Sequence, residues 1–117
     1  MTLFSDTTTQ AIEFALRGLN ERQRTTAHNI ANVNTPGFRS SRVSFEDELA
    51  EALRTGRSIE DLAPRRVLSS APTNTRGNNV LLEEESQALI TSGVQYEALV
   101  QAMNYKLGVV RSALGAR

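Results

Sequence analysis

The C-terminal third of the chain constrains the fold most, because a single apolar repeat continues through it for more than four heptads. The repeat positions are spaced alternately four and three residues apart, and they are Leu82, Ser86, Leu89, Gly93, Tyr96, Val100, Met103, Leu107, Val110 and Leu114. A strict seven-residue period predicts a helix that supercoils with a left-handed twist against a partner helix. At about 1.5 Å per residue, roughly 33 residues make a rod of roughly 50 Å.

A second, shorter helix is predicted near the N-terminus, from about Thr9 to Asn32. Its repeat positions are Ile12, Leu16, Leu19, Gln23, Thr26, Ile30 and Val33. This stripe is shorter than the first by about ten residues, so we expect apolar surface left over to face other molecules. Burying each large side chain stabilises by ~1.5–3 kcal/mol, which in sum is enough to drive assembly. The alternative is a simple two-helix hairpin with an entirely internal core.

The N-terminal helix is expected to end at a defined turn. Thr35 precedes a proline, which disfavours the helical conformation. Pro36 and Gly37 suit the two central positions of a type II turn, and the second of these needs a positive φ. Asn side chains at such sites bond to nearby backbone, and Phe38 is expected to pin the turn against a helix. The predicted turn motif consists of Asn29, Asn32, Asn34, Thr35, Pro36, Gly37 and Phe38.

The segment between the two helices is polar. Ser44 is predicted to cap a short helix that presents Leu49 and Leu53 on one face and ends at Gly56. From Thr55 to Asn79 the periodicity is lost, and Pro and Gly interrupt a stretch that we interpret as a loop or extended arm. Its polar side chains are candidate partner contacts, with a solvated loop as the alternative; they are Arg65, Arg66, Arg76, Asn78 and Asn79.

Composition argues against several classes of function. The net charge is zero, with 13 basic and 13 acidic residues, whereas nucleic-acid binders usually carry a basic surplus. The chain has no cysteine and a single histidine, His28, so we predict no metal site, catalytic site, cofactor or small-molecule substrate. The run Glu83–Glu85 is interpreted as a solvated helix start favoured by the helix dipole. No stretch approaches the ~20 apolar residues that span a bilayer, and residues 1–20 lack a signal-peptide pattern.

Three motifs resemble those of a known family. Residues 29–38 read NIANVNTPGF, which is similar to the signature shared by flagellar axial proteins of rod and hook. Residues 77–80 (GNNV), 96–100 (YEALV), 106–107 (KL) and 111–114 (RSAL) resemble the proximal rod proteins of the flagellar basal body. Two positions depart from the family pattern, because His28 stands where a second Asn is expected and Leu81 where Asp is expected.

The resemblance implies a structural role in the periplasmic rod of the bacterial flagellum. It implies synthesis in the cytoplasm, export through the flagellar type III apparatus without a cleaved signal peptide, and polymerisation with copies of itself and other rod proteins. Partners at the rod base would be membrane-ring or ring-adaptor and export-gate components. The polymer would be a hollow shaft that transmits torque around an export channel. Two alternatives stay open: another flagellar rod protein, or a helical adaptor or export chaperone outside the rod.

We therefore predict an all-α, elongated two-helix coiled coil with a largely irregular polar middle segment. Its single domain has three parts: the N-terminal helix and turn (1–38), a short helix and polar arm (39–79), and the C-terminal helix (80–117). The predicted assembly seam brings Ile12, Leu16, Leu19 and Ile30 against Leu82, Leu89, Tyr96, Val100, Met103, Leu107, Val110 and Leu114.

Overall fold

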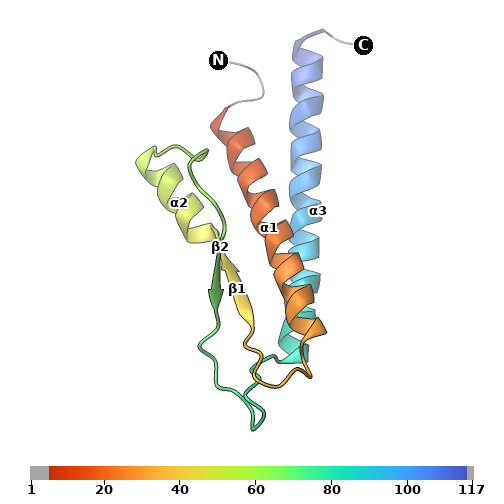
Figure 1. Ribbon diagram of the computed structural model, residues 1–117. Coiled ribbons are helices and arrows are strands. Elements are labelled where there is room, and N and C mark those ends of the chain that lie inside the picture. The colour runs from red at the N-terminus through yellow and green to blue at the C-terminus, as the bar shows by residue number, and fades with distance from the viewer. Residues whose placement is uncertain (1–5, 116–117) are drawn as a thin grey trace.

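Two long antiparallel helices form the shaft of the molecule in the computed structural model, which describes residues 6–115 (Figure 1). Helix α1 spans Thr7–Ala31 and helix α3 spans Leu82–Ala113, so both predicted terminal helices are confirmed. The molecule measures 63 × 31 × 15 Å. Since α3 has 32 residues and α1 has 25, the C-terminal end of α3 projects past the start of α1 (Figure 1).

Different signals start the two long helices. Asp6 caps α1, and its side-chain oxygen accepts a hydrogen bond of 2.8 Å from the backbone N–H of Thr9. This bond satisfies one of the free N–H groups of the first turn. Leu81 precedes α3 and supplies no side-chain cap, but three glutamates in the first turn complement the helix dipole.

The middle segment is more regular than predicted. It forms strand β1 (Ser41–Ser44), helix α2 (Glu46–Thr55) and strand β2 (Arg65–Leu68). The strands pair antiparallel, from Ser41 opposite Leu68 to Ser44 opposite Arg65. The all-α prediction is therefore wrong for this segment, because four-residue strands are too short to show a periodicity and their pairing is long-range.

The start of the short helix is also corrected. Ser44 ends β1, and Phe45 occupies the N-cap position of α2 without a side-chain cap bond. The predicted end is confirmed, since Gly56 follows α2 in the left-handed conformation with φ of 74°, which glycine adopts at little cost.

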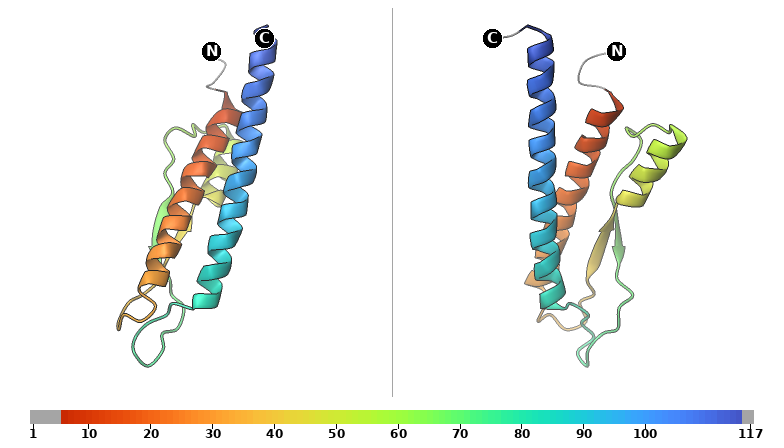
Figure 2. Two further views of the ribbon diagram at one scale, coloured as in Figure 1. Left: turned by 90° about the vertical axis from the view of Figure 1, so that its right-hand side faces the viewer. Right: turned by 180° about the vertical axis from the view of Figure 1, so that it is seen from behind.

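The main hydrophobic core lies between α1 and the middle segment, so α1 is covered by α3 on one side and by the strands and α2 on the other (Figure 2). Phe14 and Phe45 meet edge to face, with ring centroids 6.1 Å apart. Gly18 allows this approach, because a Cβ there would lie 2.4 Å from the Phe45 ring. The buried core residues are Phe14, Leu19, Val43, Phe45, Ala52, Ile59 and Leu62.

Candidate assembly surface

The side of α3 that faces α1 is rotated relative to the predicted stripe. A row of buried and half-buried residues follows this side: Glu85, Leu89, Ser92, Tyr96, Leu99, Met103, Lys106 and Val110. It keeps Leu89, Tyr96, Met103 and Val110 from the prediction. The other half of each heptad falls one residue earlier, so that Glu85, Ser92, Leu99 and Lys106 take the places predicted for Ser86, Gly93, Val100 and Leu107.

The remaining predicted seam residues of α3 lie toward solvent. Leu82 is 49% exposed, Leu107 37% and Leu114 66%, and Val100 is half-buried. On α1, Leu19 is buried, while Ile12, Leu16 and Ile30 are half-buried. The apolar pattern does not predict this half of the seam, because Glu85, Ser92 and Lys106 are polar and are buried or half-buried only through their hydrogen bonds.

An ion pair between the half-exposed Arg42 and the buried Glu85 joins β1 to α3 near the start of α3. Glu85 is only 1% exposed, so its interpretation as part of a solvated helix start is wrong. Its carboxylate accepts hydrogen bonds from Arg42 at 2.6 Å and from Asn29 Nδ2 at 3.0 Å. The Asn29 side chain also exchanges two hydrogen bonds with the backbone of Ser41. A buried carboxylate is stable only when paired in this way, so α1, β1 and α3 are held in one register.

A second ion pair fixes the register near the other end of the shaft. Lys106 Nζ lies 2.5 Å from a carboxylate oxygen of Asp6. This hydrogen bond, together with the one from Thr9 N–H, lowers the pKa of Asp6 from 3.8 to about 2. Beyond Lys106, α3 continues to Ala113 and thus past the first residue of α1.

The turn after α1 has the predicted geometry. Phe38 N–H donates to the Thr35 carbonyl at 3.2 Å, and Gly37 has φ of 77°, as a type II turn requires. Asn32 Nδ2 donates to the carbonyl of His28 at 2.9 Å. The rings of Phe38 and His28 meet edge to face at 5.5 Å, so Phe38 does pin the turn against α1.

The second motif, at residues 77–80, packs directly on this turn. Asn78 is buried, and its Nδ2 donates to the carbonyls of Asn32 at 3.0 Å and Thr35 at 2.8 Å. Its Oδ1 accepts from the Val80 N–H at 2.7 Å. Gly37 N–H donates to the Arg76 carbonyl at 2.8 Å. Two of the three motifs that carry the family resemblance therefore pack together, and we call residues 32–38 and 76–80 the interlocked base.

The Asn79 side chain also forms its hydrogen bonds within the chain. It is buried, and its Oδ1 accepts from Ser40 N–H at 2.7 Å while its Nδ2 donates to the Ala71 carbonyl at 3.1 Å. The expectation that Asn78 and Asn79 contact a partner is therefore not supported. A carboxamide both donates and accepts hydrogen bonds, so the two consecutive asparagines can bond to N–H and carbonyl groups of irregular backbone.

The three arginine candidates remain at the surface, each near a group of the same chain. Arg66 donates to Thr25 Oγ1 at 3.2 Å, and Arg76 donates to the Asn34 carbonyl at 3.4 Å. Arg65 lies 3.7 Å from the Glu48 carboxylate. All three are exposed and keep donor capacity for a partner.

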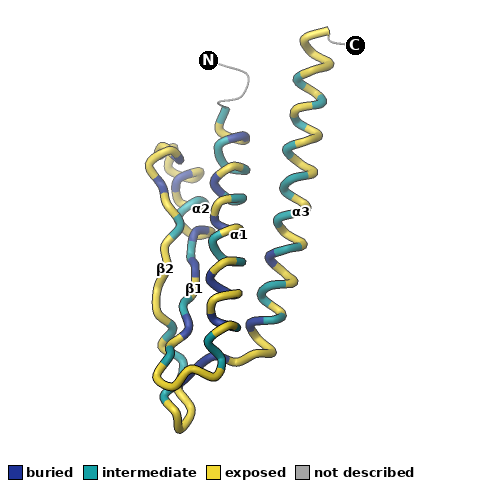
Figure 3. Tube along the Cα trace, turned by 45° about the vertical axis from the view of Figure 1, so that its right-hand side comes forward, coloured by how far each residue is buried: buried dark blue, intermediate teal, exposed yellow. Residues whose placement is uncertain are grey.

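A second apolar stripe runs along the face of α3 that is turned away from α1. Figure 3 shows that exposed positions recur along the whole length of α3. This outer stripe consists of Ile90, Val94, Ala98, Ala102, Tyr105 and Val109. Ile90 is 69% exposed, Val94 66% and Tyr105 77%. A helix that is apolar on two faces is typical of a buried helix, and α1 covers only one of them. The residues of this outer stripe recur every three or four positions in the sequence, but the prediction considered only the heptad stripe that begins at Leu82.

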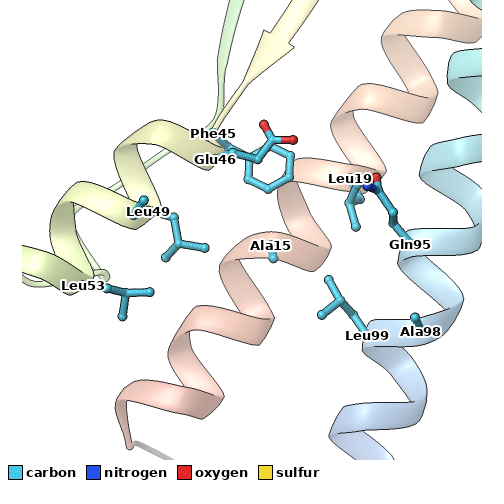
Figure 4. A pocket seen from close by; sticks show the side chains of 10 residues that line it. Ala15, Leu19, Phe45, Glu46, Leu49, Leu53, Gln95, Ala98 and Leu99 are labelled. Atoms are coloured by element: carbon cyan, nitrogen blue, oxygen red, sulfur yellow. The ribbon is translucent and has the colours of Figure 1, made fainter.

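An apolar groove of about 480 Å³ opens between α2 and α3, with α1 as its floor (Figure 4). The polar lining residues are Glu46 and Gln95, and the Glu46 carboxylate is already paired, because Arg22 donates to both of its oxygens at 2.6 Å. The Arg22 hydrogen bond also lowers the pKa of Glu46. The groove residues are Ala15, Leu19, Phe45, Glu46, Leu49, Ala50, Leu53, Gln95, Ala98 and Leu99.

Within residues 6–115, no three His, Cys, Asp or Glu side chains gather closely enough to hold a metal ion. None of the helices in that range is long and apolar enough to cross a membrane.

Comparison with known proteins gives this architecture its context. The model of the family described as "Flagella basal body rod protein" matches residues 12–39, which comprise most of α1 and the turn. The flagellar basal body rod protein FlgB of Bacillus subtilis (strain 168) is 32% identical over 126 residues, covering 97% of each chain. FlgB of Borreliella burgdorferi is 31% identical, covering 83% of this chain and 91% of the relative. FlgB of Escherichia coli (strain K12) is 25% identical, covering 80% and 85%.

The two-helix shaft, the interlocked base and these matches define a structural protein of the flagellar basal body rod. Rod proteins assemble with other rod components, and theirs is not a family of enzymes. Since the similarity to the Bacillus subtilis relative extends over 97% of the chain, this chain belongs to the FlgB family of flagellar basal body rod proteins.

Proposed function

We propose that this chain is a subunit of the proximal rod and polymerises with copies of itself and with other rod proteins into a hollow shaft. The observation that carries the proposal is the outer stripe of α3. Four of its side chains are large, and full burial of each stabilises by ~1.5–3 kcal/mol. Even after the entropy lost on association, that surface favours assembly.

The helix pair of each subunit is suited to transmitting torque, because ion pairs join α1 or its neighbouring strand to α3 near both ends of the pair. The buried Glu85 network and the Asp6–Lys106 pair oppose sliding of one helix along the other. The same proposal includes export of protein through the channel of the assembled rod. It also includes passage of the subunit itself through the type III apparatus without a cleaved signal. Arg65, Arg66 and Arg76 are proposed contacts with neighbouring subunits or with ring and export-gate components at the base.

A pair of variants on the exposed side of α3 tests the assembly role. Val94→Asp puts a charge on the outer stripe, whereas Asn104→Asp puts the same charge at an exposed polar position of the same helix. Each replaces the endogenous subunit in a motile strain, and incorporation into isolated basal bodies and swimming are measured. We expect Val94→Asp to be folded but missing from basal bodies, and Asn104→Asp to be incorporated normally.

Normal incorporation of Val94→Asp would refute the assembly role of the outer stripe. Imaging a tagged, functional copy tests the location separately. We expect the tag at the base of the rod; a tag elsewhere, or only in the cytoplasm, would favour an adaptor or export chaperone.

A further inference from the structure

The end of α3 carries apolar side chains on two of its sides. We call Tyr105, Leu107, Val109, Val110 and Leu114 the terminal knob. Tyr105 is 77% exposed, Val109 50% and Leu114 66%. Tyr105 lies next to Lys106, which pairs with Asp6 at the start of α1, and the other four members of the knob lie on the part of α3 that extends past that start (Figure 1). A helix that is apolar on more than one face is typical of a buried helix, so we expect the knob to be covered.

The apolar groove has the character of a socket for such a helix end. Leu49 and Leu53 of α2 face Leu99 of α3 across the floor formed by α1 (Figure 4). Its volume of about 480 Å³ lies in the range of cavities that enclose most of a bound group. Recognition of a helix in a groove uses apolar anchors about one turn apart, and Tyr105 and Val109 have that spacing.

Charge around the groove complements the knob. Helix α2, which supplies one wall of the groove, carries four acidic residues and one basic residue. Glu46 pairs with Arg22, Glu48 lies 3.7 Å from Arg65 and Glu51 pairs with Arg54, so Asp47 adds a further negative charge on this helix. The knob includes no acidic residue and carries Arg111 on the last turn of α3. Complementary charge at the rim of an apolar contact sets its orientation and excludes wrong partners.

We propose that the apolar groove binds the terminal knob of α3 from a second copy of this chain. The inference rests on the proposed rod function and specifies one of its subunit contacts. Knob and groove are different surfaces, so each copy inserts its knob into one neighbour and binds the knob of another neighbour in its groove. Such head-to-tail contacts build open helical assemblies or rings. Val110 lies eleven residues beyond Leu99 along α3, so parallel neighbours are staggered by about 17 Å along the shaft.

Engineered cysteines test the contact, since the chain contains none of its own. Leu53→Cys is placed at the mouth of the groove, where the native side chain is 48% exposed, and Val109→Cys on the knob. Basal bodies are isolated from a strain carrying the double variant, oxidised, and analysed by denaturing electrophoresis. We expect a ladder of cross-linked subunits that extends beyond dimers, because every copy carries both halves of the contact.

The matched control is Leu53→Cys combined with Ile90→Cys. Ile90 is exposed on the same helix but lies far from the knob, so we expect no ladder. A ladder of equal strength from this control would overturn the proposal. So would incorporated double variants without a ladder, or cross-links to a different basal-body protein.

Coexpression separates failure of this contact from failure of the proposed function. Copies with Leu53→Cys and copies with Val109→Cys are expressed together with the unmodified subunit, which maintains assembly. We expect a cross-linked dimer only when both cysteine variants are present, and its absence would overturn the inference while leaving the rod role intact. If the unmodified subunit were itself missing from basal bodies, that result would refute the proposed function, and the proposed contact would be refuted with it.

Discussion

Replacing Asn78 with alanine is expected to loosen the interlocked base. The change removes two hydrogen bonds that the side chain donates, to the carbonyls of Asn32 and Thr35, and one that it accepts from Val80 N–H. Each such bond contributes ~0.5–1.5 kcal/mol net, and a buried group left without a partner costs ~1–3 kcal/mol. Water can reach the exposed turn but not the buried Val80, so we expect a loss of about 2–4 kcal/mol from a total typically near 5–15 kcal/mol.

Urea unfolding followed by circular dichroism measures this loss. Asn34→Ala is the matched control, since it makes the same change at an exposed position of the turn on which Asn78 packs, where substitutions usually shift stability by less than ~0.5 kcal/mol. We expect the midpoint to fall for Asn78→Ala with little change in slope, and the melting temperature to fall by about 4 °C per kcal/mol. Equal midpoints for the two variants would refute the account of the base.

Three further predictions concern the core, the shaft and the assembly surface. Gly18→Ala is expected to destabilise by about 1–3 kcal/mol in urea, because the new Cβ would overlap the buried Phe45 ring; unchanged stability would contradict the packing. Because the pKa of Asp6 is lowered from 3.8 to about 2 by Lys106, its stabilisation is complete above pH 3.8 and is lost as the pH falls to about 2. Asp6→Asn should therefore have the lower urea midpoint at pH 7 and match the parent near pH 2, whereas a constant difference would argue against the ion pair. Leu107→Asp should leave the helical dichroism intact but abolish motility, and normal swimming would count against a role for that position.

The sequence predicted those parts of the fold that depend on local or periodic signals. The two terminal helices follow from their heptads, and the turn at Pro36 and Gly37 follows from dihedral preferences that need no tertiary context. Both were observed where expected.

The remainder depends on contacts between distant residues. Strands β1 and β2 are four residues each and pair across an intervening helix, so neither shows a pattern by itself. Phe45 joins Phe14 in the core only because Gly18 leaves room for its ring. The true seam of α3 includes Glu85 and Lys106, whose polar character hides their burial until Arg42, Asn29 and Asp6 are seen beside them. The apolar residues of the outer stripe can be recognised in the sequence. The sequence does not show which apolar face of α3 stays uncovered, because that depends on how α1 packs.

The accessibility of position 94 tests the central claim most directly. A functional Val94→Cys subunit is treated with a maleimide reagent both as free protein and within intact isolated basal bodies, and reactivity is restored by denaturation as a control for thiol integrity. Because Val94 is 66% exposed in the single chain, we predict rapid labelling of the free subunit and strong protection in the basal body. Equal labelling in both states would contradict assembly through the outer face of α3.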